Sequence, residues 1–474
     1  MARTSLPFAK GLPIAAKKDV VVIGGGPTGV PAALSAARAG ADTMLVEQHG
    51  WVGGQINQEM PLIGFLDSNG KQIIRGLGDE IIKRLVALRA SPGHIRDEHE
   101  ASFTPLDSRM FNAVSFQMFK EAGVTVLLDS YFADVIMEGE TIKAAVVANK
   151  SGLQAIEGKV FVDATGDADI VGRAGAPFTK GGSDGKMMAL LLWMLFYNVD
   201  WERFRDALME DPQLYDVDPD TPGISGEGMK PEYFQKTRFV NFWGFRNLVR
   251  EAQKKGYKPG NWRVGVWCPG RMDQGGYASL RYETADGTND ATDGGNVSEA
   301  EMELRMMVPD AVSFIHDWLP GWRDAVLASV SPILGVQDTR IATGEYTLTE
   351  DDILTSRRFE DVIAVGGAKI DDWETYKMIY PKGNYDIPYR CLVPKGVENL
   401  LVGGRSISAT RKAMMSVRAM GICTATGQAA GAAAALCAKG NISPRRLDHR
   451  RLRELLLQQG VYLGSGELDG GSGS

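Results

Sequence analysis

The sequence is poor in the side chains that cross-link chains or bind metals. It has four cysteines and five histidines among 474 residues. Cys268, Cys391, Cys423 and Cys437 show no CxxC spacing, and no two histidines stand at ligand spacing. We therefore expect no disulfide framework and no metal site, whether zinc or iron–sulfur. The low cysteine usage also favours a reducing, cytoplasmic location.

The chain also lacks a basic surplus and a long apolar run. Lys and Arg total 52 against 59 Asp and Glu, a formal net charge of −7, which argues against a nucleic-acid partner. The longest apolar stretch, residues 187–197, is about half of what a membrane helix needs, and residues 1–18 carry no secretory signal pattern. No GxSxG elbow is present, so acyl transfer has no support. We expect a cytoplasmic protein without a membrane partner.

Glycine, by contrast, is abundant, and its 56 residues gather at particular turns. Residues 19–23 (DVVVI) predict a buried strand, residues 27–39 a helix and residues 43–46 a second strand. The turn between the first strand and the helix reads GGGPTG, from Gly24 to Gly29. Gly24 permits a tight turn, Gly26 lets a pyrophosphate approach the backbone, and Gly29 lets the helix pack on the strand. Glu47 ends the next strand, where a carboxylate binds a ribose hydroxyl.

This fingerprint serves both NAD and FAD, and the acid at position 47 disfavours NADP. Three further segments indicate FAD. Residues 51–55 add a second glycine pair, residues 161–169 predict a strand that runs into an ATG turn, and residues 400–405 predict another strand that runs into glycines. Residues 416–418 open an alanine-rich helix, whose N-terminus could stabilise negative charge on a flavin.

At these segments the sequence resembles the FAD-dependent oxidoreductases related to the flavoprotein subunits of fumarate reductase and succinate dehydrogenase. The resemblance runs from about residue 19 to 457 and is most specific over residues 399–410 and 416–431. It implies FAD, a discontinuous FAD domain and an inserted substrate domain. It also implies hydride exchange between a substrate and flavin N5. Carried onto this chain, Glu47 would bind the adenosine ribose, Arg405 would contact the ribityl chain, and Val417 and Arg418 would offer backbone amides to the flavin.

The residues expected to contact FAD share one property, which is their place in or beside these turns. They are Gly24, Gly26, Pro27, Thr28, Gly29, Glu47, Gln48, Gly53, Gly54, Gln55, Phe132, Ala164, Thr165, Gly166, Gly404, Arg405, Ser416, Val417 and Arg418.

Two departures from the family pattern concern histidine. Relatives carry a histidine after the segment that ends at Thr410, where this chain has Arg411, and often another near residues 371–373, where it is absent. We therefore expect noncovalent FAD. Four side chains are candidates for substrate anchoring and proton transfer: Arg340, Tyr389, Arg390 and Arg411. For Arg340 and Arg390 an equal alternative is an interior salt bridge or hydrogen bonds to loop carbonyls.

The predicted fold is α/β, with a doubly wound, Rossmann-like FAD domain interrupted by an α+β substrate domain. The FAD domain takes residues 18–180 and 335–445, and the inserted domain residues 181–334, whose tryptophans could line a pocket or form its core. Residues 446–474 are expected to form a C-terminal helix and a flexible tail. Residues 416–438 are predicted as one long helix, and residues 187–193 as a buried strand or helix.

We expect an oxidoreductase that transfers a hydride between a small organic substrate and flavin N5. No second strand–GxGxxG–helix is present, so an external electron acceptor or donor completes the cycle. One alternative is a flavin-dependent monooxygenase, although such enzymes usually carry an Asp-Gly motif where this chain reads Gly404-Arg405. The other is an electron-relay subunit with an iron–sulfur partner. A homo-oligomer is the commonest assembly for such a chain.

Overall fold

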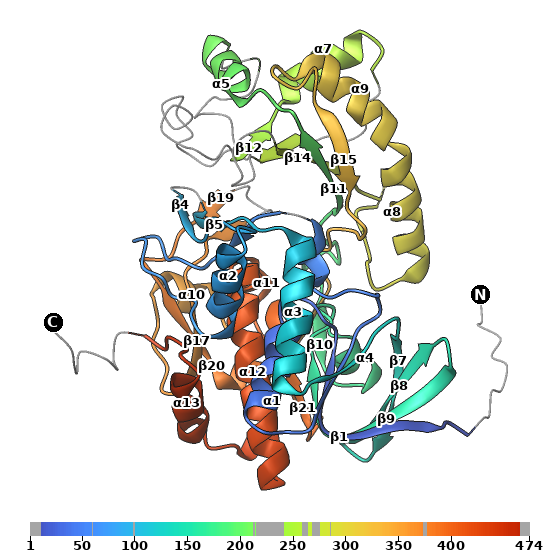
Figure 1. The fold of residues 1–474 in the computed structure, drawn as a ribbon, viewed down its shortest axis with the longest axis vertical. Coiled ribbons are helices and arrows are strands. Elements are labelled where there is room, and N and C mark those ends of the chain that lie inside the picture. Colours follow the sequence, from blue (N-terminus) through green and yellow to red (C-terminus); the bar gives the residue numbers. More distant parts are fainter. Residues whose placement is uncertain are drawn as a thin grey trace.

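The computed structural model describes residues 11–58, 60–97, 100–211, 214, 241–257, 264–267, 275–284, 286–372 and 377–464. Cys268, Trp373 and the tail from residue 465 lie outside the described residues. The molecule has a larger part that holds both described ends of the chain and a smaller part that stands above it (Figure 1).

The larger part is organised around a parallel sheet. Its strands are β1 (Ile14–Ile23), β2 (Thr43–Val46), β6 (Thr125–Leu127), β9 (Gly152–Asp163) and β21 (Leu400–Val402), in the order β6-β2-β1-β9 with β21 also paired to β9. The N-terminal half of β9 pairs antiparallel with β8 (Thr141–Asn149), which pairs with β7 (Tyr131–Glu138). In register, Ile23 stands beside Val46 and Asp163. The turns after β1, β2 and β9 therefore open at one edge of the sheet, as expected for a nucleotide-binding fold.

Helices α1 (Gly29–Arg38), α2 (Leu77–Ala87), α3 (Ser108–Ala122) and α12 (Met420–Gly440) gather beside this sheet (Figure 1). α12 packs closely on α1 because it presents glycine there. A Cβ at Gly427 would lie 2.1 Å from the carbonyl oxygen of Thr28, and one at Gly431 would lie 2.0 Å from that of Ala32. α12 is long and apolar enough to cross a membrane, but it is largely buried inside the protein as a core helix.

Short elements complete the larger part. β3 (Leu62–Ile63), β5 (Ala101–Thr104) and β4 (Ile95–Asp97) form one small sheet. Three pairs stand apart from it: β10 (Phe178–Lys180) with β16 (Arg340–Ala342), β17 (Val362–Gly366) with β20 (Tyr385–Pro388), and β18 (Ile370–Asp372) with β19 (Lys377–Ile379). The remaining helices are α4 (Asp169–Arg173), α10 (Glu350–Leu354), α11 (Arg411–Val417) and α13 (His449–Gln458).

The smaller part is an antiparallel sheet with its own helices. The strand order is β12 (Asn241–Gly244), β13 (Val264–Trp267), β14 (Gly276–Tyr282), β11 (Leu190–Tyr197) and β15 (Val326–Val330). The helices are α5 (Trp201–Glu210), α7 (Arg246–Lys254), α8 (Gly294–Met306) and α9 (Val308–Trp318). Buried side chains from both form a separate core, in which the rings of Trp201 and Trp322 lie 5.6 Å apart.

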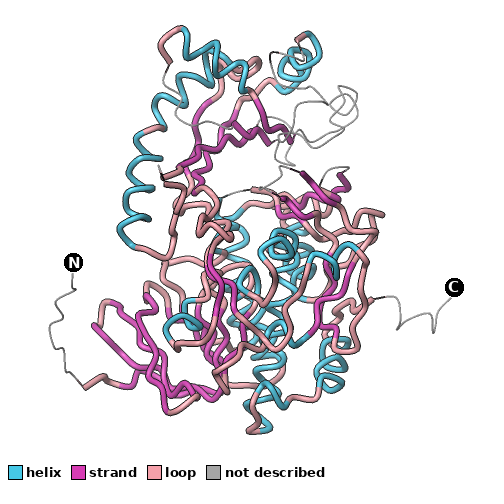
Figure 2. The backbone as a smooth tube through the Cα atoms, turned by 180° about the vertical axis from the view of Figure 1, so that it is seen from behind, coloured by secondary structure: helices cyan, strands magenta, loops and turns pink. Residues whose placement is uncertain are grey.

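The fold class predicted from the sequence is therefore confirmed, and Figure 2 shows the same combination of helices and strands from behind. The domain boundaries stay predictions, although the smaller sheet lies wholly within residues 181–334. One detail differs. The helix expected over residues 416–438 is broken, because Ala419 (φ −54°, ψ 128°) is extended between α11 and α12. The segment at residues 187–193, expected as a buried strand or helix, leads into the buried strand β11.

Candidate active site

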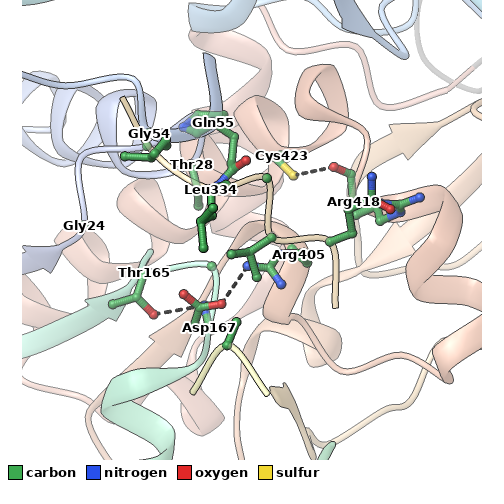
Figure 3. Close-up of a pocket in the computed structure, with 18 of the residues that line it drawn as sticks. Gly24, Thr28, Gly54, Gln55, Thr165, Asp167, Leu334, Arg405, Arg418 and Cys423 are labelled. Atoms are coloured by element: carbon green, nitrogen blue, oxygen red, sulfur yellow. Dashed lines mark hydrogen bonds and ion pairs between the residues drawn. The ribbon is translucent and has the colours of Figure 1, made fainter. Parts of the chain in front are cut away.

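One large cavity, of about 660 Å³, follows the edge of the parallel sheet and runs to the smaller part. It is lined by the turns after β1, β2 and β9, by the start of α12 and by Trp193 of β11. In Figure 3 the glycine turns stand on one side of it, with Arg405 and Arg418 on the other. The elements that line this cavity come from both ends of the sequence.

The glycines of the first turn have distinct structural roles. Gly24 has a φ of +95°, and a Cβ there would lie 2.6 Å from the carbonyl oxygen of Ala164. A Cβ at Gly29 would lie 1.7 Å from the carbonyl oxygen of Gly24, so only glycine allows α1 to begin there. A Cβ at Gly26 would meet only Gly54 Cα, at 3.9 Å. Gly26 therefore leaves space on the cavity side, whereas Gly24 and Gly29 serve the turn itself.

Glu47 closes one end of the cavity. Its carboxylate accepts hydrogen bonds from the amides of Gly25 (2.6 Å) and His49 (3.0 Å). Burial raises the pKa of this carboxyl, and the amide donors act against that rise. Gln48 and Phe132 line the same part of the cavity, as expected. His49 also lines it, stacked on Trp51 with ring centroids 4.3 Å apart.

The ATG turn after β9 is held by Asp163, which is fully buried. Its carboxylate accepts from the amide of Thr165 (3.2 Å) and from the amide of Ile170 (2.8 Å). Ala164, Thr165 and Gly166 consequently line the cavity. From the opposite side, Arg405 forms an ion pair with Asp167 (2.7 Å), shown in Figure 3.

Some residues expected to contact the cofactor support the lining without forming part of it. The amide of Gly53 donates to the carbonyl of Gly25 (2.7 Å), and the amide of Gly404 donates to Thr426 Oγ1 (3.0 Å). Ser416 and Val417 are buried beneath the start of α12, whereas Arg418, one residue on, lines the cavity. The expected contact set is thus split: Gly24, Gly26, Pro27, Thr28, Glu47, Gln48, Gly54, Gln55, Phe132, Ala164, Thr165, Gly166, Arg405 and Arg418 line the cavity, and Gly29, Gly53, Gly404, Ser416 and Val417 do not.

The expected catalytic set stays a prediction, and the structure brings only part of it to the cavity. Tyr389 is buried away from the cavity, where its hydroxyl donates to the carbonyl of Pro444 (2.9 Å). Arg390 is ion-paired with buried Asp361 (2.9 Å), but its own side chain is 49% exposed, so this salt bridge lies at the surface rather than in the interior. Neither side chain lines the cavity, because Tyr389 has its partner at Pro444 and Arg390 at Asp361.

The two other arginines divide between the cavity and its support. Arg340 forms an ion pair with Asp169 (2.9 Å), the salt bridge of its alternative, and also lines the cavity, so substrate anchoring by it stays a prediction. Arg411 lies outside the lining, with its Nε donating to buried Asp338 (2.9 Å). Contact between Arg411 and a substrate stays a prediction that the lining of the cavity does not support.

Comparison with known proteins identifies the family. Residues 19–456 match the model of the FAD dependent oxidoreductase family. The chain is an FAD-dependent oxidoreductase. This confirms the family in its broad sense, together with the cofactor and the enzyme class expected from the sequence.

Individual relatives of this FAD-dependent oxidoreductase are distant. It is 28% identical over 176 residues to the thiamine thiazole synthase of Aeropyrum pernix, over 33% of this chain and 57% of that protein. Among solved structures, a geranylgeranyl bacteriochlorophyll reductase-like protein of Thermoplasma acidophilum matches 95% of this chain and 84% of its own, with 13% identity and a TM-score of 0.45. The p-nitrophenol 4-monooxygenase of Pseudomonas putida matches 96% and 90%, with 11% identity and a TM-score of 0.41.

The cavity of the FAD-dependent oxidoreductase suits its cofactor. The Cβ-free backbone at Gly26 offers amides at the N-terminal end of α1, where pyrophosphates bind. Glu47 stands where an adenosine ribose would be held. Arg418 lines the far end, and its buried Nε has no hydrogen-bond partner among the described residues. A buried donor left unpaired costs free energy, so it favours a ligand that accepts from it.

A cluster of charged side chains beside Arg418 escaped sequence reasoning. Glu100, Lys369 and Asp371 line the same end of the cavity. Lys369 Nζ lies 2.7 Å from Glu100 Oε1 and 3.5 Å from Asp371 Oδ1. Burial acts to lower the pKa of Lys369, but the two carboxylates outweigh it and raise that pKa. Glu100 and Lys369 are 269 positions apart in the sequence, so no local motif predicts their contact.

Proposed function

We propose that the enzyme transfers a hydride between a small organic substrate and flavin N5, and that an external electron acceptor or donor restores the flavin. The observation that supports this is the continuity of the cavity. The same 660 Å³ space that begins at the nucleotide turns ends against both apolar and ionised side chains beside α12. Bound FAD supplies a hydride acceptor or donor in such a space, and the protein supplies binding and orientation.

The residues of the chain divide this work among them. The ion pair of Arg405 with Asp167 and the hydrogen bond from Arg405 Nη1 to Thr339 Oγ1 (3.0 Å) fix the wall next to the ATG turn. Just before α12, Arg418 presents its buried Nε, a donor without a partner among the described residues. Lys369 stays protonated between its carboxylates, so it orients charge rather than exchanging its own proton with a substrate.

The test is bleaching of the flavin under anaerobic conditions. The purified holoenzyme is mixed with panels of alcohols, amines, carboxylates and activated alkenes, and loss of the visible flavin band is followed. Compounds that bleach the oxidised flavin, or that reoxidise the dithionite-reduced flavin, would support hydride transfer. The absence of either across the panels, with FAD bound, would refute it.

The same preparation separates the two alternatives. A flavin-dependent monooxygenase would consume oxygen and insert it into product, with a nicotinamide as reductant. An electron-relay subunit would turn over only with a partner that co-purifies. Acid precipitation tests the attachment of the cofactor, and we propose that FAD appears in the supernatant because Arg411 stands where relatives carry a histidine.

The closer family relationship and the cellular location of the enzyme are also proposals. The closer relation to fumarate reductase and succinate dehydrogenase flavoproteins is supported by residues 399–410 and 416–431. A cytoplasmic enzyme that binds neither nucleic acid nor membrane is supported by the net charge of −7 and the four cysteines. Cell fractionation and size-exclusion chromatography would test the location and the expected homo-oligomer.

A further inference from the structure

The end of the cavity beside α12 joins a charged wall to an apolar one. The charged wall is a chain of alternating signs, Glu100, Lys369, Asp371 and Arg418, with the Asp371 Oδ2 to Arg418 Nη2 distance at 3.4 Å. This charge chain ends on a cation. Glu100, Lys369 and Asp371 pair with one another within the chain. Arg418, at its end, keeps a donor, Nε, that has no partner among the described residues.

Arg418 is the only member of the chain whose donors are clearly unsatisfied by described residues. Its side chain is 15% exposed, and its guanidinium makes one long hydrogen bond, to Asp371, while buried Nε makes none. Burial lowers the pKa of this guanidinium, against the pull of Asp371. A guanidinium in this state gains most from a planar acceptor that takes two parallel N–H donors, which is the geometry of a carboxylate.

The apolar wall stands directly beside the charge chain. Met60, Pro61, Ile63 and Trp193 line the cavity there. Trp193 and Phe103 belong to one buried cluster, against which Met60 and Ile63 pack. Ile63 of β3 pairs with Phe103 of β5, and Glu100 immediately precedes β5. The small sheet of β3, β5 and β4 therefore connects the two walls, through Ile63 on β3 and Glu100 next to β5.

This pairing of walls limits the charge of a ligand. The charge chain holds two acids and two bases and is neutral as a whole, and its lysine is already paired twice. A second carboxylate on a body that lies along the apolar wall would meet Met60, Ile63 or Trp193, where burial of an unpaired charge is costly. An apolar body in that place instead loses water from its surface and from the wall.

We infer that the substrate class of this enzyme is the apolar monocarboxylic acid, held by a bidentate contact to Arg418 with its body against the wall of Met60, Ile63 and Trp193. The inference rests on the proposed function, since it names the substrate of that same site. Arg418 then favours ligands that carry a carboxylate over ligands that carry none. The apolar wall disfavours ligands that carry two.

The experiment is isothermal titration calorimetry of the FAD-loaded enzyme with four probes: phenylacetate, phenylacetamide, acetate and succinate. Phenylacetate should bind about tenfold or more tightly than phenylacetamide, because hydrogen bonds to charged groups are the stronger ones. It should also bind about tenfold or more tightly than acetate, which lacks the apolar body. Succinate should bind more weakly than phenylacetate.

Variants then assign the effect to Arg418. In Arg418→Gln, phenylacetate and phenylacetamide should bind alike, whereas Arg418→Lys should keep part of the preference as a point charge. The matched control is Arg109→Gln on the outer surface of α3, where the side chain is 71% exposed and paired with Asp107. It should retain the wild-type order of all four probes.

Several results would overturn the inference: equal binding of phenylacetate and its amide, tighter binding of succinate, no binding of phenylacetate, or an unchanged preference in Arg418→Gln. If Arg418→Gln no longer binds FAD, the four probes measured on the wild-type enzyme still test the inference. Because calorimetry needs no turnover, the expected order without any flavin bleaching would leave this inference standing and refute hydride transfer. Flavin bleaching together with a different order of probe affinities would support hydride transfer and refute this inference.

Discussion

Two alanine substitutions three residues apart should separate the folding role of the glycine turn from its cofactor role. Gly26→Ala adds a methyl group into space, because the nearest atom to its Cβ is 3.9 Å away. Gly29→Ala places the same methyl 1.7 Å from the carbonyl oxygen of Gly24. Real Cβ contacts below 3.0 Å are essentially never found, so α1 must move away from β1 by at least 1.3 Å.

The two variants should therefore differ in the apo protein. Gly29→Ala should lower the free energy of unfolding by about 1–3 kcal/mol, the usual cost of overpacking. Gly26→Ala should leave it unchanged or raise it by about 0.4–1 kcal/mol, because alanine restricts the unfolded chain. Gly11→Ala, with nothing within 4 Å of its Cβ, is the matched control.

The affinity for FAD should rank the two variants in a different order from their free energies of unfolding. A methyl at Gly26 would stand between the backbone amides and the pyrophosphate, and each charge-assisted hydrogen bond lost costs about 1.5–3 kcal/mol. Gly26→Ala should thus raise the Kd for FAD at least about tenfold. Thermal unfolding of the apo protein and fluorescence titration with FAD measure the two quantities. Wild-type affinity in Gly26→Ala would refute the assignment of this turn to the pyrophosphate.

Four further substitutions test other parts of the structure. Glu47→Gln should raise the Kd for FAD about tenfold, because a charge-assisted acceptor for the ribose is lost, and an unchanged Kd in the same titration would count against that contact. Although burial acts to raise it, hydrogen bonds from His94 and a lysine lower the pKa of buried Asp79 to about 2. The shift from 3.8 corresponds to about 2.5 kcal/mol of stability, present above pH 4 and lost as the pH falls toward 2. Urea unfolding of Asp79→Asn should show that deficit at pH 7 and a shrinking one below pH 4, and a deficit independent of pH would contradict it. Tyr389→Phe should cost about 1 kcal/mol of stability, and neither it nor Arg390→Gln should slow flavin bleaching, whereas a tenfold slower rate would return these residues to the catalytic set.

The sequence predicts the local parts of the site well. Gly24, Gly29 and Glu47 belong to one βαβ unit, where spacing along the chain and spacing in space are tied together. The ATG turn after β9 is predictable for the same reason, since a strand that ends in small residues at the sheet edge must face the nucleotide.

The non-local parts are beyond such reasoning. Lys369 meets Glu100 across 269 positions, and neither stands in a motif. The direction of a side chain is equally hidden: the segment that holds Tyr389 and Arg390 was expected to face the flavin, yet both side chains point elsewhere because Asp361 and Pro444 supply their partners. The break at Ala419 was also missed, since alanine favours continuation of a helix.

The contact of α12 with α1 has a consequence for biosynthesis. Thr28 and Ala32 of the nucleotide-binding unit lie against Gly427 and Gly431, about 400 positions later in the chain. A ribosome that has made the first strand, turn and helix must therefore add almost the whole remaining chain before the helix that covers them exists. Cofactor capture is expected late in synthesis, after the smaller part has emerged. Until then the glycine turn and its apolar neighbours stay exposed to water and to other chains.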